Sequence, residues 1–224
     1  TTDSHYDTHV KDKRLLYTLG LAKKYIVNMT ETLGKKTIRQ FSVKADNPVG
    51  ISFFGNKEGG QLDVQGGAGD VIIAGTVHNG KGSTNLSGKN LIQGQNGFID
   101  AKSLNLTATE HAGTKEGAIR TNAGTLSGTA GGNFAVSAEK GILITGNIEA
   151  GATVTLTAAE GLSQKEGTLV EGHRIELDAG SGAITTDAGG AFAIAAGKPS
   201  REGRDPSYGL KAAARGNIDI VNRT

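Results

Sequence analysis

The chain has 224 residues, of which 35 are glycine and only 3 are proline, and it contains neither cysteine nor tryptophan. The lack of cysteine excludes a disulfide scaffold and a thiolate zinc site, and the scarcity of proline together with the absence of a three-residue glycine period excludes collagen. A formal net charge of +2 does not indicate a nucleic-acid footprint over the whole chain, and no apolar run approaches the roughly 18 residues needed to span a membrane.

Residues 1–36 differ from the rest because they contain two of the five histidines but only two glycines. We interpret them as a non-repeat N-terminal segment or cap. Two structures fit the segment. A strand fits residues 25–27, whereas helical spacing relates Leu15, Leu16, Leu19, Ala22, Tyr25, Ile26 and Met29, which predicts an amphipathic helix.

From residue 37 onward, apolar side chains alternate with polar ones, which is typical of β-strands. Glycine, asparagine or aspartate separates most of the short apolar runs, and these residues adopt tight turns at low cost. We predict strands at residues 62–64, 71–73, 104–108, 134–136, 142–144, 154–156, 175–177, 184–186, 192–194 and 218–221.

The repeat region contains internal echoes. A glycine pair followed by alternating apolar residues occurs at 59–64, 131–136 and 189–194. Residues 104–110 resemble residues 154–160, and a Lys-Glu-Gly triplet follows each of them. Such self-similarity indicates a solenoid.

Two folds bury many short strands: a sandwich or barrel of hairpins, and a parallel β-helix. Residues 142–151 supply two strands with a single glycine bend, which suits the corner of a coil better than a hairpin. We therefore predict an all-β, right-handed parallel β-helix over residues 37–224, with roughly 20 residues per coil. Two prolines and several cations predict a loop that leaves the coil at about 198–215.

Basic residues of that loop form the candidate partner-binding site. A solvated loop is the simpler interpretation of such a charge run, but contact with an acidic glycan or protein is the functional one. The candidate residues are Lys198, Arg201, Arg204, Tyr208, Lys211 and Arg215.

Other motifs give weaker signals. Residues 66–72 partly match a calcium-binding nonapeptide, but Asp70 comes one residue early and no second copy stacks on it, so a corner is expected. His5 and His9 would share a metal only on a helix. The Lys-Glu-Gly triplets at 57–59, 115–117 and 165–167 are expected to be solvated turns. We expect no cofactor and no metal.

The pattern of residues 62–80 and 134–151 resembles the repeats of filamentous haemagglutinin-like exoproteins of the two-partner secretion class, which includes adhesins, haemolysins and contact-dependent growth inhibition effectors. Because the sequence begins with Thr1, we interpret it as a piece of a longer protein. The resemblance implies a rod segment of a secreted or surface-exposed Gram-negative protein, without enzymatic activity. It also implies a glycan or protein of a host or neighbouring cell as partner, and an outer-membrane secretion partner for the parent protein. The small net charge leads us to expect no nucleic-acid partner.

Two alternatives remain. A β-helix polysaccharide lyase or glycoside hydrolase would need clustered carboxylates, and adjacent coils could align Asp63 with Asp70 or Asp178 with Asp187. A phage-type receptor-binding spike would require a stable trimer.

Overall fold

The computed structural model describes residues 4–10, 13–19, 25–32, 38–45, 49–54, 60–197 and 209–223. Every regular element in these ranges is a strand, so they contain no helix that could cross a membrane. The strands are β1 (Ser4–Val10), β2 (Lys13–Leu19), β3 (Tyr25–Thr32), β4 (Ile38–Ala45), β5 (Val49–Phe54), β6 (Gln61–Gln65), β7 (Val71–Gly88), β8 (Leu91–Gln93), β9 (Phe98–Ala108), β10 (Ile119–Thr121), β11 (Thr125–Ala130), β12 (Phe134–Ala138), β13 (Ile142–Ala150), β14 (Thr153–Ala158), β15 (Leu162–Gln164), β16 (Val170–Gly172), β17 (Arg174–Asp178), β18 (Ile184–Thr186), β19 (Phe192–Ala196), β20 (Gly209–Ala213) and β21 (Ile220–Asn222).

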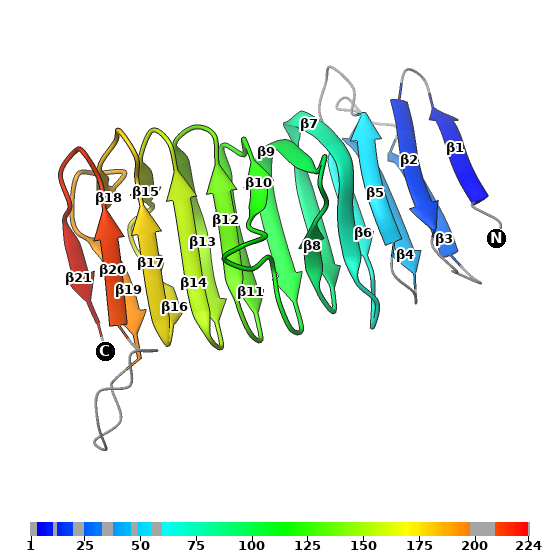
Figure 1. Ribbon diagram of the computed structural model, residues 1–224. Coiled ribbons are helices and arrows are strands. Elements are labelled where there is room, and N and C mark those ends of the chain that lie inside the picture. The colour runs from blue at the N-terminus through cyan, green and yellow to red at the C-terminus, as the bar shows by residue number, and fades with distance from the viewer. Residues whose placement is uncertain are drawn as a thin grey trace.

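The strands stack as successive turns of one coil, which confirms the expected parallel β-helix (Figure 1). A first ladder of parallel-paired residues follows one side of the coil, and about six turns separate Val71 from Leu210. Its members are Val49, Val71, Leu91, Ala112, Phe134, Val154, Ile175 and Leu210. From Val71 to Ile175, neighbours in this ladder lie 20 to 22 positions apart in the sequence, as the expected coil length requires.

A second ladder follows another side of the same coil. It connects Phe41, Leu62, Thr84, Leu104, Leu126, Ile144, Gln164 and Thr186. Along each strand, side chains that point into the coil alternate with side chains that point outward, and the inward ones form the core between the ladders. In β14, for example, Val154 and Leu156 are fully or almost fully buried, whereas Thr155 between them is half-exposed.

The segments that resemble one another in sequence lie on different sides of the coil. Leu62 and Leu104 belong to the second ladder, whereas their apparent equivalents Phe134 and Val154 belong to the first. The repeated unit is therefore a strand with its corner, and it is shorter than a full coil.

The N-terminal strands pair in a different sense from the rest. β1 pairs with β2, β2 with β5 and β3 with β4, all antiparallel, whereas β4 and β5 continue into the parallel coil through β6 and β7. The amphipathic helix is therefore wrong, and the strand alternative at residues 25–27 lies within β3. Strand pairing decides the outcome, because β3 has β4 beside it along its whole length.

The expected loop at 198–215 is shorter than predicted. Residues 198–208 lie outside the described part of the chain, but Gly209–Ala213 forms β20, which pairs in parallel with β17. Leu210 takes its place in the first ladder, and Ile218 bridges to Ile184, so the chain has rejoined the coil by residue 209.

Candidate functional site

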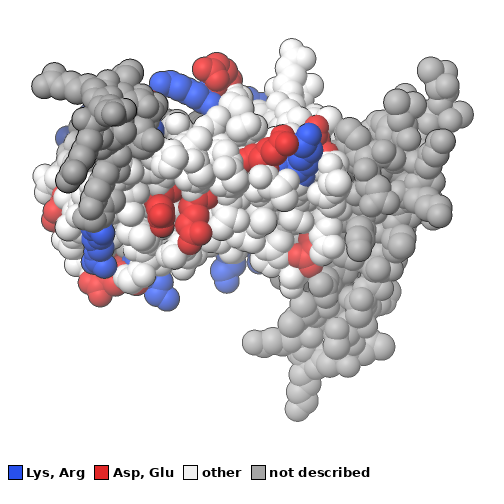
Figure 2. All heavy atoms as spheres, turned by 90° about the horizontal axis from the view of Figure 1, so that it is seen from below, with Lys and Arg blue, Asp and Glu red and all other residues white. Residues whose placement is uncertain are grey.

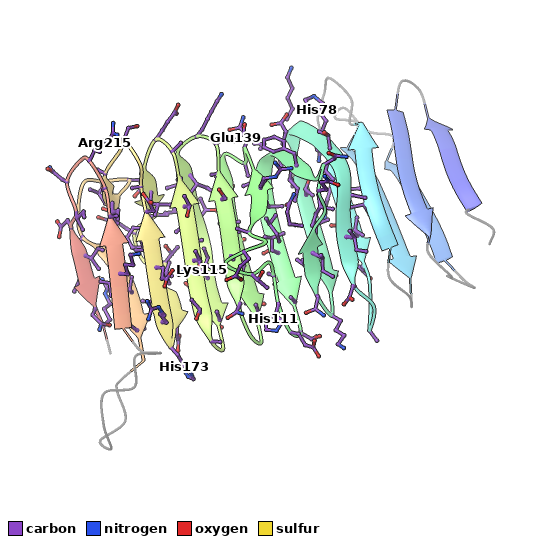
Figure 3. The ribbon with its side chains drawn as sticks, in the orientation of Figure 1. His78, His111, Lys115, Glu139, His173 and Arg215 are labelled. Carbon is purple, nitrogen blue, oxygen red and sulfur yellow. The ribbon has the colours of Figure 1, made fainter. Side chains whose placement is uncertain are left out.

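One coil carries an insertion on its outer side. Ala112 pairs with Phe134 and Ile119 pairs with Val136, so residues 113–118, here called the strap, lie opposite the single residue Ala135. Ala135 points outward but is only 1% exposed. Figure 3 shows Lys115 of the strap over the face of the sheet, whereas His173 and Arg215 lie at its lower and upper edges.

A tight turn gives the strap its shape. The backbone of Thr114 and that of Gly117 exchange two hydrogen bonds, of 3.2 and 3.1 Å, and the Thr114 hydroxyl also accepts from the Gly117 N–H. Gly113 has φ +73°, and a Cβ there would lie 2.5 Å from the Ala135 carbonyl oxygen, so only glycine fits. The Lys-Glu-Gly triplet at 115–117 is thus a turn, as is the one at 165–167, while 57–59 lies outside the described residues.

The strap is pinned to β17, three coils further along the solenoid. The Lys115 Nζ lies 3.0 Å from Oε2 of Glu176, and Nε of Arg174 donates to its Oε1 at 2.7 Å. The Glu176 side chain is 11% exposed, so a partly desolvated carboxylate lies between two cations. The hydrogen bond from Lys115 lowers the pKa of Glu176 below its ordinary value, Arg174 acts in the same direction, and burial opposes them.

A hollow of about 350 Å³ lies beside this ion-pair group. Its volume is in the range of small-molecule sites. The lining consists of Lys115, Glu116, Asn133, Ala135, Thr153, Thr155, Arg174 and Glu176. The hollow therefore offers carboxylates, cations, hydroxyls and an amide, and a single apolar side chain.

Side chains at one corner of the coil form a series of hydrogen bonds from each coil to the next, here called the corner ladder. From Asp70 to Asn133, the side chain just before a first-ladder position accepts a hydrogen bond from the backbone N–H of its equivalent in the next coil. Asn90 N–H donates to Asp70 Oδ1 at 3.2 Å, His111 N–H to Asn90 Oδ1 at 3.1 Å, Asn133 N–H to His111 Nδ1 at 2.9 Å and Thr153 N–H to Asn133 Oδ1 at 3.3 Å. The expected corner at 66–72 is thus confirmed, with Asp70 as its first acceptor.

Outward residues of β6, β7, β9 and β11 form a face here called the polar array. Asp63 is its only charged member, and Ser127 Oγ donates across one coil to Asn105 Oδ1 at 3.0 Å. The array comprises Gln61, Asp63, Gln65, Ser83, Asn85, Ser87, Ser103, Asn105, Thr107, Thr125, Ser127 and Thr129. It presents hydroxyl and amide groups at the spacing of stacked strands, about 4.8 Å.

The candidate basic residues are only partly described. Lys198, Arg201, Arg204 and Tyr208 lie outside the described residues. Lys211 is exposed on β20 and is in register with Glu176, so it lies one coil beyond the strap's ion-pair group.

Arg215 is also exposed but follows the carboxyl end of β20 at the upper edge of the sheet (Figure 3). The structure therefore places Lys211 on the face that carries the strap, and Arg215 at its margin.

The carboxylate pairs that an enzyme would need are not aligned by strand register. Asp63 lies opposite Asn85, and Asp178 lies opposite Thr157 and Ala213. Asp70 instead belongs to the corner ladder. Among the described residues, no group of three or more histidines and carboxylates could hold a metal ion.

The histidines serve separate purposes. His5 and His9 lie on strand β1, so the helix on which they would share a metal is absent. His78 Nδ1 lies 2.8 Å from Asp100 Oδ2 on the surface, and His111 belongs to the corner ladder.

Sequence reasoning missed the strap and its contact with β17. Lys115 and Glu176 are 61 positions apart, and the sequence marks Lys115 only as part of a Lys-Glu-Gly turn. The available signal was local: Gly113 and Gly117 bracket an interruption of the alternating pattern between Ala112 and Ile119.

Charged side chains occur in small separate groups of both signs on the surface seen in Figure 2, so this view shows no large field of one sign. Comparison with protein-family models, curated proteins and solved structures finds no match for the chain.

Proposed function

We propose that this chain is a structural and binding segment of a rod. In this proposal it is the β-solenoid part of a large secreted or surface-exposed bacterial exoprotein of the filamentous haemagglutinin-like kind. The rod mediates adhesion or presents a distal receptor-binding or toxin module. Its partner is a glycan or protein on a host or neighbouring cell, and the parent protein crosses the outer membrane through a dedicated secretion partner.

The observation that carries this proposal is that the inside of the coil supplies the stability, whereas the outside presents polar groups to solvent. Inside, the buried apolar members of both ladders pack against the coils before and after them, so a rod of any length can be built by adding coils. Outside, the members of the polar array are half-exposed or exposed, and each strand that contributes to it presents amide groups, hydroxyl groups or both.

An adhesion assay tests the proposal. Beads coated with the chain are incubated with epithelial and bacterial cells, and the bound beads are counted. Asn105→Lys places a charge and a long side chain in the middle of the polar array, and Thr157→Lys makes the same kind of change at a half-exposed outward position of β14. We expect adhesion of the wild type, reduced adhesion of the Asn105 variant and unchanged adhesion of the Thr157 variant.

Failure of the wild-type beads to bind any cell above uncoated beads would refute the binding role. Equal losses in the two variants would show that the polar array is not the binding surface. Circular dichroism of both variants confirms that the coil is intact.

A further inference from the structure

The hollow beside the strap has a chemical character that restricts its ligand. Its charged lining residues are two cations, Lys115 and Arg174, and two carboxylates, Glu116 and Glu176. The formal charges cancel, so the lining exerts little net attraction on an anion or a cation. The hollow is therefore poorly suited to a phosphate, a nucleotide or a polyanionic chain.

Three of the four remaining lining residues are also polar. Thr153 and Thr155 supply hydroxyls, which donate and accept, and Asn133 supplies an amide. Ala135 is the only apolar residue of the lining, and it is almost completely covered. An apolar ligand would leave these donors and acceptors without partners, which is costly.

A metal ion is equally unsuitable, because both oxygens of Glu176 already interact with cations, Oε1 with Arg174 and Oε2 with Lys115. An uncharged ligand with many hydroxyl groups fits, since each hydroxyl donates one hydrogen bond and accepts others. Carboxylates, cations, hydroxyls and an amide in one hollow are all partners for such groups.

We infer that the hollow between the strap and the strands β12, β14 and β17 binds one residue of a neutral sugar. This inference goes beyond the proposed function, because the hollow is a second binding site that shares no residue with the polar array. The strap contributes Lys115 and Glu116 to its lining, and β14 contributes Thr153 and Thr155.

The chain offers a matched pair of variants. Thr155 and Thr157 both point outward from β14 and are both half-exposed, but only Thr155 lines the hollow. Valine replaces threonine with nearly the same shape and removes the hydroxyl. Thr155→Val therefore removes one hydrogen-bonding group from the hollow, and Thr157→Val is the control.

The test is a titration of the isotopically labelled chain with sugars, followed by amide chemical shifts in NMR spectra. The probes are the methyl glycosides of glucose, galactose, mannose and N-acetylglucosamine, and glucuronate as a charged probe. We expect at least one neutral glycoside to cause saturable shifts at residues of the strap and of β14. Thr155→Val should weaken that binding about threefold to tenfold, the effect of one hydrogen bond, and Thr157→Val should leave it unchanged.

Three results would overturn the inference: no saturable shift at the hollow with any neutral probe, tighter binding of glucuronate than of every neutral probe, or equal effects of the two valine variants. The titration measures the hollow alone. Sugar binding without cell adhesion would therefore refute only the proposed function, and adhesion without sugar binding would refute only this inference.

Discussion

From the corner ladder we predict that the side chain of His111 stabilises the fold by accepting a hydrogen bond. The His111 Nδ1 atom accepts a 2.9 Å hydrogen bond from the backbone N–H of Asn133, and its neighbours in the ladder perform the same task with Asp and Asn side chains. His111→Ala removes the acceptor. His111→Asn keeps one, in the form that Asn90 and Asn133 already use one coil before and after.

The magnitude follows from the surroundings of the bond. Asn133 is half-buried, so its N–H regains only part of its hydration when the acceptor is lost. A bond of this kind contributes about 1 kcal/mol, and a donor left fully unsatisfied costs up to about 3 kcal/mol. The imidazole also occupies the space beside Gly132, where a Cβ would lie 2.5 Å from the ring. We therefore expect His111→Ala to lower the free energy of unfolding by about 1–2 kcal/mol and His111→Asn to lower it by less than about 0.5 kcal/mol.

Thermal and urea unfolding, followed by circular dichroism, measure the global effect. For a chain of this size, the alanine variant should melt about 3–6 °C below the wild type. Hydrogen exchange gives the local effect, because coils of a solenoid can open separately. The amide of Asn133 should exchange faster in the alanine variant and at the wild-type rate in the asparagine variant. Equal losses in both variants, or no loss in either, would refute the ladder as a source of stability.

Three further changes test the charge group and the core. Because the pKa of Glu176 is lowered in the folded state, its contribution to stability is complete above the ordinary carboxyl pKa of 4.5 and is lost as the pH falls through the lower folded value. Glu176→Gln should therefore flatten the acid limb of a plot of unfolding free energy against pH, and an unchanged acid limb would contradict the ion-pair assignment. Phe134 is fully buried, so Phe134→Ala should cost about 3–5 kcal/mol in urea unfolding, and a loss below about 1 kcal/mol would show that the ring is not packed as described. Gly128→Ala would place a Cβ 2.8 Å from Cε2 of the same ring and against the Leu106 carbonyl, and should cost about 2 kcal/mol. Gly141→Ala, where the nearest atom would be 3.6 Å away, is its control and should unfold like the wild type.

The fold was predictable because its determinants are local. Alternation such as Val154, Thr155 and Leu156 reveals a strand with one buried side, and short spacing between glycine-separated strands favours coils over hairpins. Lys211 shows where this reasoning stops, because its run of cations suggested a loop although Leu210 occupies a ladder position. The cations and prolines of this stretch predicted a loop, whereas pairing with β17 makes residues 209–213 a strand.

The candidate site was less predictable because it depends on contacts between coils. The ion pair of Lys115 with Glu176 forms because the strap extends over several coils. How far it extends cannot be read from the spacing of residues in the sequence. The corner ladder was hidden for another reason. Asp70, Asn90 and His111 share only an acceptor atom, so no repeated letter marks their common role.

The strap has a consequence for how such a chain can change. Its six residues leave the coil after Ala112 and return at Ile119, and the pairing on both sides continues in register. The coil thus tolerates an insertion at its surface without altering the frame that supports it. The outward residues of one coil can therefore be replaced without changing the buried residues or the strand pairing that support them. One rod can therefore acquire a new surface specificity by replacing a few residues in a single coil.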